Sequence, residues 1–338
     1  MALATGALAV GRVMTTILDN ATVAIDGGTG TLGQALVEYL LSLGCLRKLV
    51  VLSRSESRQA AMKQRFPENG GPLRYLIGDV RDRSRLVDAY EGADVVIHVA
   101  ALKRVEVCER EPKEAMLTNV LGTMNACEAA RQCGVHRFVM VSSDKATASC
   151  TTYGATKYCA ERLTIGMNNY RGARDLRYSV VRYGNVMGST GSVLHTFRGA
   201  NVRVPITDPA MTRFWITPGG AARFIVSSLD LMRGGEVFVP KLPSARILDM
   251  AAAFAPHSEI EIVGMRGVEK ITECMISDSE APWTIDLGDR YALLPASPQW
   301  PDAGWPGYER MPAGWSYTSA NNDRWLTVPE LQEMASAA

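Results

Sequence analysis

Gly27-Gly28-Thr29-Gly30-Thr31-Leu32-Gly33 is the stretch that decides the fold of this 338-residue chain. It reads G-x-x-G-x-x-G and lies between an apolar run expected to be a strand, Thr22–Asp26, and an expected helix, Thr31–Leu43, which ends at Gly44. Glycines at this spacing let backbone amides and a helix N-terminus approach a pyrophosphate closely. A structural turn is the alternative for the glycines alone. Their position between strand and helix favours a dinucleotide site.

Strands and helices alternate along the first half of the chain. The apolar runs expected to be further strands are Lys48–Ser53, Leu73–Ile77, Asp94–Ala100, Arg137–Ser142 and Tyr178–Arg182. The helices expected between them are Arg83–Tyr90, Pro112–Cys133 and Tyr153–Asn169. This alternation predicts an α/β fold, a Rossmann-type doubly wound parallel sheet with right-handed crossovers.

The alternation breaks down after about residue 185, where Pro, Gly and Trp accumulate, most densely in Pro282–Trp315. We expect residues 14–185 to form the dinucleotide-binding domain. Residues 186–330 should form mostly a smaller, loop-rich substrate lobe, which could return strands or helices to the first domain. Residues 1–13 are interpreted as an extension, because Met14 offers an alternative start.

Composition argues against several classes of protein. Apolar residues make up 47% and charged residues 21% of the chain, as in an ordinary globular protein. The net charge of +1 gives no reason to expect nucleic acid or a membrane surface as a partner, and the apolar run 2–10 is too short to span a bilayer. Seven Cys without paired spacing indicate reduced thiols and a cytoplasmic location, and four His without a C-x-x-C argue against a metal site.

Two acid/base pairs follow the fifth expected strand: Asp144 with Lys145, and Tyr153 with Lys157. Tyr and Lys at positions i and i+4 of a helix point the same way, and an ammonium beside a phenol lowers the pKa of the phenol. We therefore expect Tyr153 to take a proton from a sugar hydroxyl at neutral pH. Burial should raise the pKa of Asp144 and lower that of Lys145. Together the pairs indicate an enzyme that oxidises a carbinol and eliminates a neighbouring group, whereas a solvated Asp-Lys pair in a loop is the alternative.

The second expected strand ends in Ser53-Arg54-Ser55, without the acidic residue that would bind a ribose 2′-hydroxyl. Arg54 could pair with a 2′-phosphate through a charged fork, which favours NADP over NAD as the cofactor. A solvated loop charge is the alternative for Arg54. Asp79, after the third expected strand, could accept the adenine amino group or cap the following helix.

Further motifs occur along nearly the whole chain. They are Gly78-Asp79-Val80-Arg81-Asp82, Ala100-Ala101-Leu102-Lys103, Ser143-Asp144-Lys145-Ala146, Val181–Val186, Pro205–Asp208, Met211–Thr217, Phe238–Lys241 and Asn321–Trp325. With these motifs, residues from about Leu18 to Leu326 resemble the extended short-chain dehydrogenase/reductase superfamily. More narrowly, the chain resembles the C5-inverting UDP-N-acetylglucosamine 4,6-dehydratases of the pseudaminic-acid type. Asp144-Lys145 distinguishes the inverting dehydratases from their relatives, because related retaining dehydratases carry Asp-Glu there and 4-epimerases carry small hydroxyl residues.

The resemblance implies an NADP-dependent hydro-lyase that self-associates and converts UDP-N-acetylglucosamine to UDP-2-acetamido-2,6-dideoxy-β-L-arabino-hexos-4-ulose. Tyr153 and Lys157 would serve oxidation at C4. An uncharged Lys145 could take the C5 proton, with Tyr153 or water as the alternatives. Asp144 would protonate the departing C6 hydroxyl, and Ser143 lies in the same motif. Hydride would return to C6 and a proton to the opposite face of C5, which inverts that centre.

The resemblance also implies two sets of binding residues. Those for the cofactor are Gly27, Thr29, Gly30, Thr31, Leu32, Gly33, Ser53, Arg54, Asp79, Val80, Ala100, Ala101, Lys103, Tyr153 and Lys157. Those for the UDP-sugar are Lys103, Asn185, Arg213, Arg266 and Glu269. Arg213 and Arg266 are expected on the two phosphates, and a structural ion pair is the alternative for each.

Three features depart from the family's pattern. Asp26 stands where the family usually has Thr, which would place a carboxylate near the pyrophosphate. The segment Arg266–Lys270 reads R-G-V-E-K in place of R-P-G-E-K, which loosens the turn expected to present Arg266. The segment Gly191–Val204 is shorter than in the family, near the expected sugar site.

Two other functions stay open at this point. A nucleotide-sugar 4-epimerase would also use Tyr153 and Lys157, but it would have no work for Asp144-Lys145. A non-catalytic NADP-binding protein is the second alternative. Only Asp26 and the altered turn in Arg266–Lys270 support it.

Overall fold

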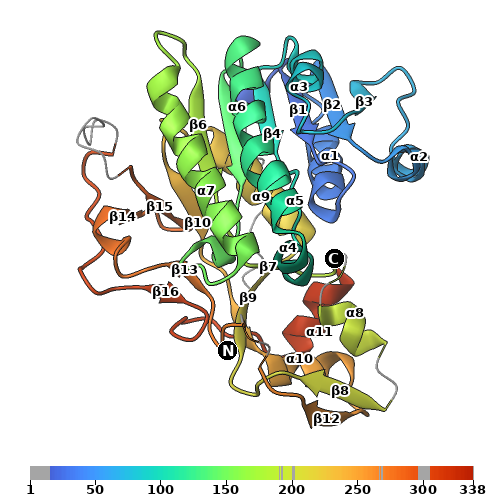
Figure 1. Cartoon of the computed structure of the whole chain (residues 1–338), viewed down its shortest axis with the longest axis vertical. Coiled ribbons are helices and arrows are strands. Elements are labelled where there is room, and N and C mark those ends of the chain that lie inside the picture. The colour runs from blue at the N-terminus through green and yellow to red at the C-terminus, as the bar shows by residue number, and fades with distance from the viewer. Residues whose placement is uncertain are drawn as a thin grey trace, which may run out of the picture.

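The computed structural model describes residues 16–189, 191, 193–199, 202–265, 267, 269–295 and 305–337. The extension expected at residues 1–13 and the candidate Arg266 lie outside this described part. A nine-stranded sheet runs through the upper part of the molecule in the order β14-β15-β10-β6-β5-β4-β1-β2-β3 (Figure 1). The block from β3 to β6 is parallel throughout. This order confirms the predicted Rossmann-type doubly wound sheet.

The six parallel strands closely follow the expected runs. They are β1 (Thr22–Asp26), β2 (Lys48–Ser53), β3 (Leu73–Ile77), β4 (Val95–His98), β5 (Arg137–Val141) and β6 (Arg177–Val181). The first three have the predicted bounds, and the others differ by one or two residues at one or both ends. Val23, Val51, Ile97 and Val139 are fully buried. Continuous apolar runs suit parallel strands that are covered on both faces.

Helices cover both faces of the sheet (Figure 1). One layer consists of α3 (Arg83–Tyr90), α6 (Gly122–Gln132) and α7 (Thr152–Gly166), and the other of α1 (Thr31–Leu43) and α9 (Pro218–Leu229). Shorter or more peripheral helices are η1 (Thr16–Leu18), α2 (Glu56–Arg65), α4 (Val105–Arg110) and η4 (Met167–Tyr170). The predicted elements did not include α2, which is mostly polar.

The single helix expected at Pro112–Cys133 is divided into three parts. These are α5 (Pro112–Ala115), a π-helical stretch (Met116–Leu121) and α6. Asn119 in the π-helical stretch accepts from the Leu102 amide at 2.7 Å and donates to the Leu102 carbonyl at 2.9 Å and to Thr156 Oγ1 at 3.0 Å. A π-helical turn redirects a side chain in this way, often at a functional site. Here it joins the loop after β4 to α7.

The chain after residue 185 contributes to both parts of the molecule. β10 (Val237–Pro240) pairs in parallel with β6, and the antiparallel strands β15 (Arg290–Leu293) and β14 (Thr284–Asp286) extend the sheet. The Pro-rich segment Pro282–Trp315 carries only short elements in its described residues, as its composition predicts.

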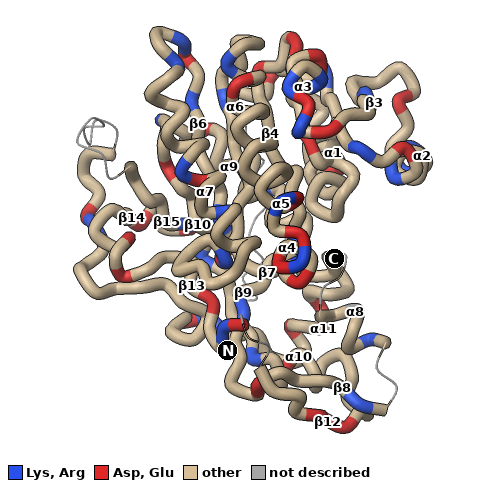
Figure 2. The backbone as a smooth tube through the Cα atoms, in the orientation of Figure 1, with Lys and Arg blue, Asp and Glu red and all other residues tan. Residues whose placement is uncertain are grey.

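A smaller lobe with its own core lies below the sheet in Figure 1. Its strands are β7 (Asn185–Val186), β8 (Arg203–Ile206), β9 (Thr212–Ile216), β11 (Ser244–Arg246) and β12 (Glu259–Ile262). Its helices are α8 (Val193–Arg198), α10 (Ile247–Phe254) and α11 (Val328–Ser336). β13 (Cys274–Ile276) pairs with β16 (Tyr317–Thr318), and η5 (Ala281–Trp283) precedes β14. Basic and acidic residues are interspersed over both parts (Figure 2).

Helix α7 packs very closely on the short helix η3 (Asp144–Ala146) that follows β5. A Cβ atom on Gly154 would lie 2.1 Å from the Lys145 carbonyl oxygen and 2.4 Å from Ser149 Oγ. Thr151 caps the helix by accepting from the Gly154 amide at 3.0 Å. Only glycine therefore lets α7 lie this close to the segment that carries Asp144 and Lys145.

We predict that Gly154→Ala lowers the stability of the protein by about 1–3 kcal/mol, because a backbone carbonyl blocks the added methyl group. Gly166→Ala on the same helix is the matched control, since no atom lies within 4 Å of its Cβ position. Alanine should stabilise that helical position by about 0.5–1 kcal/mol. Unfolding in urea, followed by circular dichroism, measures both effects. Equal stability of the two variants would contradict the close packing.

Candidate active site

The polar residues after β5 are fixed by the backbone of β6 and its continuation. The Ser142 amide donates to the Val181 carbonyl at 2.7 Å, and the Asp144 amide donates to the Tyr183 carbonyl at 3.0 Å. Ser143 Oγ accepts from the Lys145 amide at 3.3 Å and donates to Asp144 Oδ1 at 2.9 Å. These contacts place Asp144 and Lys145 at the C-terminal edge of the parallel sheet, where doubly wound folds bind ligands.

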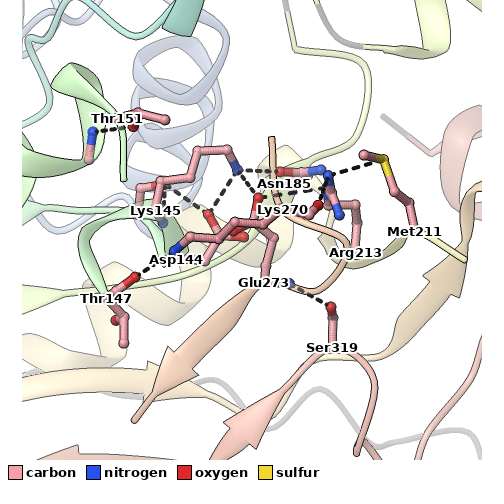
Figure 3. A network of polar contacts seen from close by, with 12 residues as sticks. Asp144, Lys145, Thr147, Thr151, Asn185, Met211, Arg213, Lys270, Glu273 and Ser319 are labelled. Carbon is pink, nitrogen blue, oxygen red and sulfur yellow. Dashed lines mark hydrogen bonds and ion pairs between the residues drawn. The ribbon is translucent and has the colours of Figure 1, made fainter. Parts of the chain in front are cut away.

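The Lys145 ammonium lies in a buried ionic cluster (Figure 3). Lys145 Nζ is 3.1 Å from Asp144 Oδ1, 3.2 Å from Glu273 Oε1 and 3.4 Å from Asn185 Oδ1. The Asp144 side chain is 1% exposed and that of Glu273 is 5% exposed, whereas Lys145 is 25% exposed. The structure thus brings the predicted residues Asp144, Lys145 and Asn185 together and adds Glu273.

The pKa values of Asp144 and Lys145 are both raised above their ordinary values. Burial raises the pKa of Asp144, and Glu273 raises it further, against the opposing effect of Lys145. Burial acts to lower the pKa of Lys145, but the charges of Asp144 and Glu273 outweigh burial and raise it. The expectation for Asp144 agrees with the structure. The expectation of a lowered pKa for Lys145 is wrong, because a second carboxylate contacts the ammonium.

Tyr153 and Lys157 lie on one side of α7 and are both buried. Burial raises the pKa of Tyr153 to about 12, while Lys145 and a hydrogen bond with Ser143 act to lower it. Lys157 Nζ donates to the Val141 carbonyl at 2.6 Å, and burial lowers the pKa of Lys157 to about 8. The expectation that Lys157 makes Tyr153 acidic is therefore wrong in this arrangement. The cation that acts on the phenol is Lys145.

Three glycines of the glycine-rich turn leave no room for a side chain. A Cβ atom would lie 2.6 Å from the Ala100 amide nitrogen at Gly27, 2.7 Å from Val51 Cγ1 at Gly28 and 2.3 Å from the Gly28 carbonyl at Gly33. Gly27 also has a φ of 67°, in the left-handed region. Gly30 is the N-cap of α1 and no side chain caps that end. This tight cradle at a helix N-terminus fits the pyrophosphate of a dinucleotide.

Asp26 has a structural task that accounts for its departure from the family's pattern. Its Oδ2 accepts from Tyr90 at 2.6 Å and contacts His98 Nδ1 at 2.7 Å, and its Oδ1 accepts from the amides of Val99 at 3.2 Å and Ala100 at 2.9 Å. Burial opposes ionisation, but His98 and these hydrogen bonds lower the pKa of Asp26. The carboxylate therefore fastens β1 to the loop after β4.

The predicted Arg54 lies next to Asp79, with Arg54 Nη1 3.7 Å from Asp79 Oδ2 and 55% of the Arg54 side chain exposed. Asp79 does not cap α3, because Asp82 accepts from the Arg85 amide at that position. Val80 is buried beside Gly122. Partial burial of its ammonium and, after it, the charge of Arg58 on α2 lower the pKa of Lys103. The sequence interpretation did not name Arg58 as a cation that acts on the predicted site residue Lys103.

Arg213 has a different set of contacts from the one expected. Its guanidinium donates to the carbonyl oxygens of Thr212 at 2.7 Å, Ile271 at 3.0 Å and Lys270 at 2.9 Å, and its Nε lies 3.7 Å from Glu273 Oε1. These contacts tie β9 to the segment before β13, which is the structural alternative considered for this residue. Glu269 is partly buried in the same segment.

Glu273 and Asn119 are the site residues that the sequence interpretation missed. Asn119 joins the loop after β4 to α7, and Glu273 completes the ionic cluster. Glu273 lies in the run Lys270-Ile271-Thr272-Glu273, next to the predicted segment Arg266–Lys270, which is the one signal for it. In the part of the chain that the structure describes, no cluster of His, Cys, Asp or Glu could hold a metal ion. No helix in these described ranges is long and apolar enough to cross a membrane.

Comparison with known proteins gives one consistent family. The family model described as polysaccharide biosynthesis protein matches residues 23–295. The inverting UDP-N-acetylglucosamine 4,6-dehydratase of Campylobacter jejuni is 39% identical over 322 residues, which cover 92% of this chain and 96% of the relative. The UDP-glucose 4-epimerase of Rickettsia canadensis is 34% identical over 282 residues, 80% of this chain and 82% of the relative.

A solved structure agrees with these sequence relatives. Pen from Bacillus thuringiensis superimposes with a TM-score of 0.85 at 32% identity, covering 95% of this chain and all of that chain. The resemblance to inverting UDP-N-acetylglucosamine 4,6-dehydratases in the extended short-chain dehydrogenase/reductase superfamily is thereby confirmed. This chain belongs to the polysaccharide biosynthesis protein family.

Proposed function

We propose that the chain is an NADP-dependent, inverting UDP-N-acetylglucosamine 4,6-dehydratase, a hydro-lyase. The observation that carries the proposal is the buried contact of 3.1 Å between Lys145 Nζ and Asp144 Oδ1, on the segment against which α7 packs. Oxidation at C4 alone needs only Tyr153 and a nicotinamide cofactor. A buried acid and base beside that tyrosine serve a second reaction, elimination. The 39% identity to the Campylobacter jejuni enzyme supports the same choice over the epimerase.

Tyr153 would take the proton of the C4 hydroxyl. Its pKa is about 12 in this environment, so it needs nearby positive charge to act near neutral pH. Lys145 supplies part of that charge, and a hydrogen bond with Ser143 also acts to lower the pKa of Tyr153. The oxidised nicotinamide supplies the hydride acceptor for C4 and, once reduced, the hydride donor for C6.

Asp144 and Lys145 would carry out the elimination through one internal proton transfer. A proton moves from Lys145 Nζ to Asp144 Oδ1 across 3.1 Å, which turns the ion pair into a neutral amine and a carboxylic acid. The amine then takes the C5 proton, which the C4 ketone has made acidic. The acid gives its proton to the C6 hydroxyl, which leaves as water. The pair returns to ammonium and carboxylate. When hydride adds to C6, the proton that Tyr153 took from the C4 hydroxyl would pass, directly or through water, to the opposite face of C5, so that protons balance over the whole cycle.

The remaining parts of the proposal rest on the resemblance and on general chemistry. The residues Gly27, Thr29, Gly30, Thr31, Leu32, Gly33, Ser53, Ala100 and Ala101 would hold the dinucleotide, and Lys103, Asn185, Arg213, Arg266 and Glu269 the UDP-sugar. A homo-oligomer and a cytoplasmic location are included, and the seven free cysteines support the location.

NADP, and not NAD, is proposed because Arg54 and Arg58 flank the end of β2 and the start of α2, where the 2′-position of a bound dinucleotide is read. Arg54→Ala should weaken NADP binding by about 1–3 kcal/mol and leave NAD binding unchanged. Arg65→Ala is the control, because Arg65 on α2 is equally exposed, at 54%, and pairs with Glu38. Calorimetric titration measures both affinities. Equal losses for NADP and NAD in the Arg54 variant would show that Arg54 does not read the 2′-phosphate.

The two acid/base pairs should be separable by mutation. Asp144→Asn keeps the size of the side chain but removes the transferable proton, so elimination should slow by about 10²–10⁴. This variant should accumulate reduced cofactor with UDP-N-acetylglucosamine and stall at the 4-keto stage. Tyr153→Phe should form no reduced cofactor at all. Tyr158→Phe, an exposed position on the same helix, should behave as wild type.

Absorbance of the reduced nicotinamide during a single turnover reports both steps. Full activity in Asp144→Asn would rule out the acid role of Asp144. Reduced cofactor in Tyr153→Phe would rule out Tyr153 as the base of the oxidation.

A further inference from the structure

Glu273 lies where the sheet and the smaller lobe meet, and it belongs to none of the sequence motifs named above. Its backbone is held to β16 and the chain that follows it, since the Glu273 amide donates to Ser319 Oγ at 3.0 Å and the Ser319 amide donates to the Glu273 carbonyl at 2.8 Å. Its side chain reaches Lys145 on η3 at 3.2 Å and Arg213 on β9 at 3.7 Å (Figure 3). One carboxylate thus joins the acid/base segment to the smaller lobe.

The burial of Glu273 requires an explanation. The residue is 4% exposed, and a buried carboxylate is costly unless cations and donors compensate it. Its Oε1 faces both cations, whereas Oε2, like Asp144 Oδ2, is buried and has no hydrogen-bond partner in the described chain. An apolar side chain of similar volume would avoid this cost. The carboxylate is therefore better explained by what it does to Lys145 than by stability.

We propose that Glu273 is a positioning residue for the elimination step. Its carboxylate holds the Lys145 ammonium against Asp144, so that the Asp144-Lys145 pair retains the one proton that the two side chains share. The inference rests on the proposed dehydratase function. Lys145 has three N–H donors, and Asp144, Glu273 and Asn185 accept at 3.1, 3.2 and 3.4 Å. With its donors directed in this way, the amine can turn only a little, so proton transfer to Asp144 Oδ1 keeps a fixed geometry.

The charge of Glu273 has a predictable effect on both members of the pair. The charged groups facing this cluster are Asp144 and Lys145 from η3, Arg213 from β9, and Lys270 in the same segment as Glu273. Burial opposes ionisation of Glu273, but Lys145 and Arg213 keep its pKa below the ordinary value, so it is a carboxylate at neutral pH. A fixed negative charge raises the pKa of Asp144 and of Lys145, and its removal must lower both.

Glu273→Gln tests the proposal, since glutamine keeps the size and one acceptor oxygen but removes the charge. In a single turnover with UDP-N-acetylglucosamine, reduced cofactor should appear at nearly the wild-type rate and disappear about 10–100-fold more slowly. The acidic limb of the pH profile for that disappearance should move to lower pH, because Asp144 holds its proton less firmly. Glu280→Gln is the matched control: Glu280 is a mostly buried carboxylate of the same segment, 3.0 Å from Arg182. A merely structural role would change thermal stability in both variants but leave the ratio of the two rates and the pH profile unchanged.

Reactivity of the Lys145 amine gives a second measurement that needs no substrate. Competitive acetylation at fixed pH, read by mass spectrometry, should label Lys145 about tenfold faster in Glu273→Gln than in wild type, the effect of lowering the pKa by one unit. Glu280→Gln should match wild type. Unchanged labelling of Lys145 in Glu273→Gln would overturn the role of Glu273. The same ratio between the rates of cofactor reduction and reoxidation in Glu273→Gln and Glu280→Gln would also overturn it. A wild-type protein that leaves UDP-N-acetylglucosamine intact would instead overturn the proposed function, and the labelling would still test the contact.

Discussion

One ammonium between two buried carboxylates is the interaction on which the rest of the site depends. Lys145 joins Asp144, which the backbone of β6 fixes, to Glu273, which the chain after β16 fixes. Asp144 can be buried only because this cation compensates it, and the same holds for Glu273. The same ion pairs therefore hold the smaller lobe in position and determine the protonation of the Asp144-Lys145 pair.

The packing around this cluster is equally constrained. Gly154 lets α7 lie against η3, so that Tyr153 comes close enough to Lys145 for the ammonium to act on the phenol. Arg182, which is 1% exposed, connects α7 to β13. Its Nη2 lies 2.7 Å from Glu161 Oε2 on α7, and its Nη1 donates to the Met275 carbonyl in β13 at 2.8 Å. α7, β13 and the chain just after β6 are thus held together by one buried guanidinium, and η3, which carries Asp144 and Lys145, packs against α7 and β13.

Sequence reasoning predicts local elements and motifs well and contacts between distant segments poorly. The bounds of β1, β2, β3, α1 and α3 follow from apolar runs and punctuating glycines, and the structure has them as expected. The proximity of Asp144 and Lys145 follows from their adjacency. The contact between Lys145 and Glu273 joins residues far apart in the chain, so no spacing rule indicates it. That contact reversed the expected pKa shift of Lys145. Sequence also left two roles open for Arg213, phosphate binding and a structural contact, and only the tertiary structure shows its bonds to the backbone carbonyls before β13. Asp26, which seemed anomalous in sequence, is satisfied by His98, Tyr90 and two amides.

In the proposed reaction, the buried Asp144 and Lys145 remove water across C5 and C6, and C5 is inverted. The most direct test incubates the protein with UDP-N-acetylglucosamine in heavy water and analyses the product by mass spectrometry and proton NMR. We expect a 4-keto product that has lost one water, carries one deuterium at C5 and has the inverted configuration there. A product that keeps its water, or one that retains the C5 configuration, would contradict the proposed reaction.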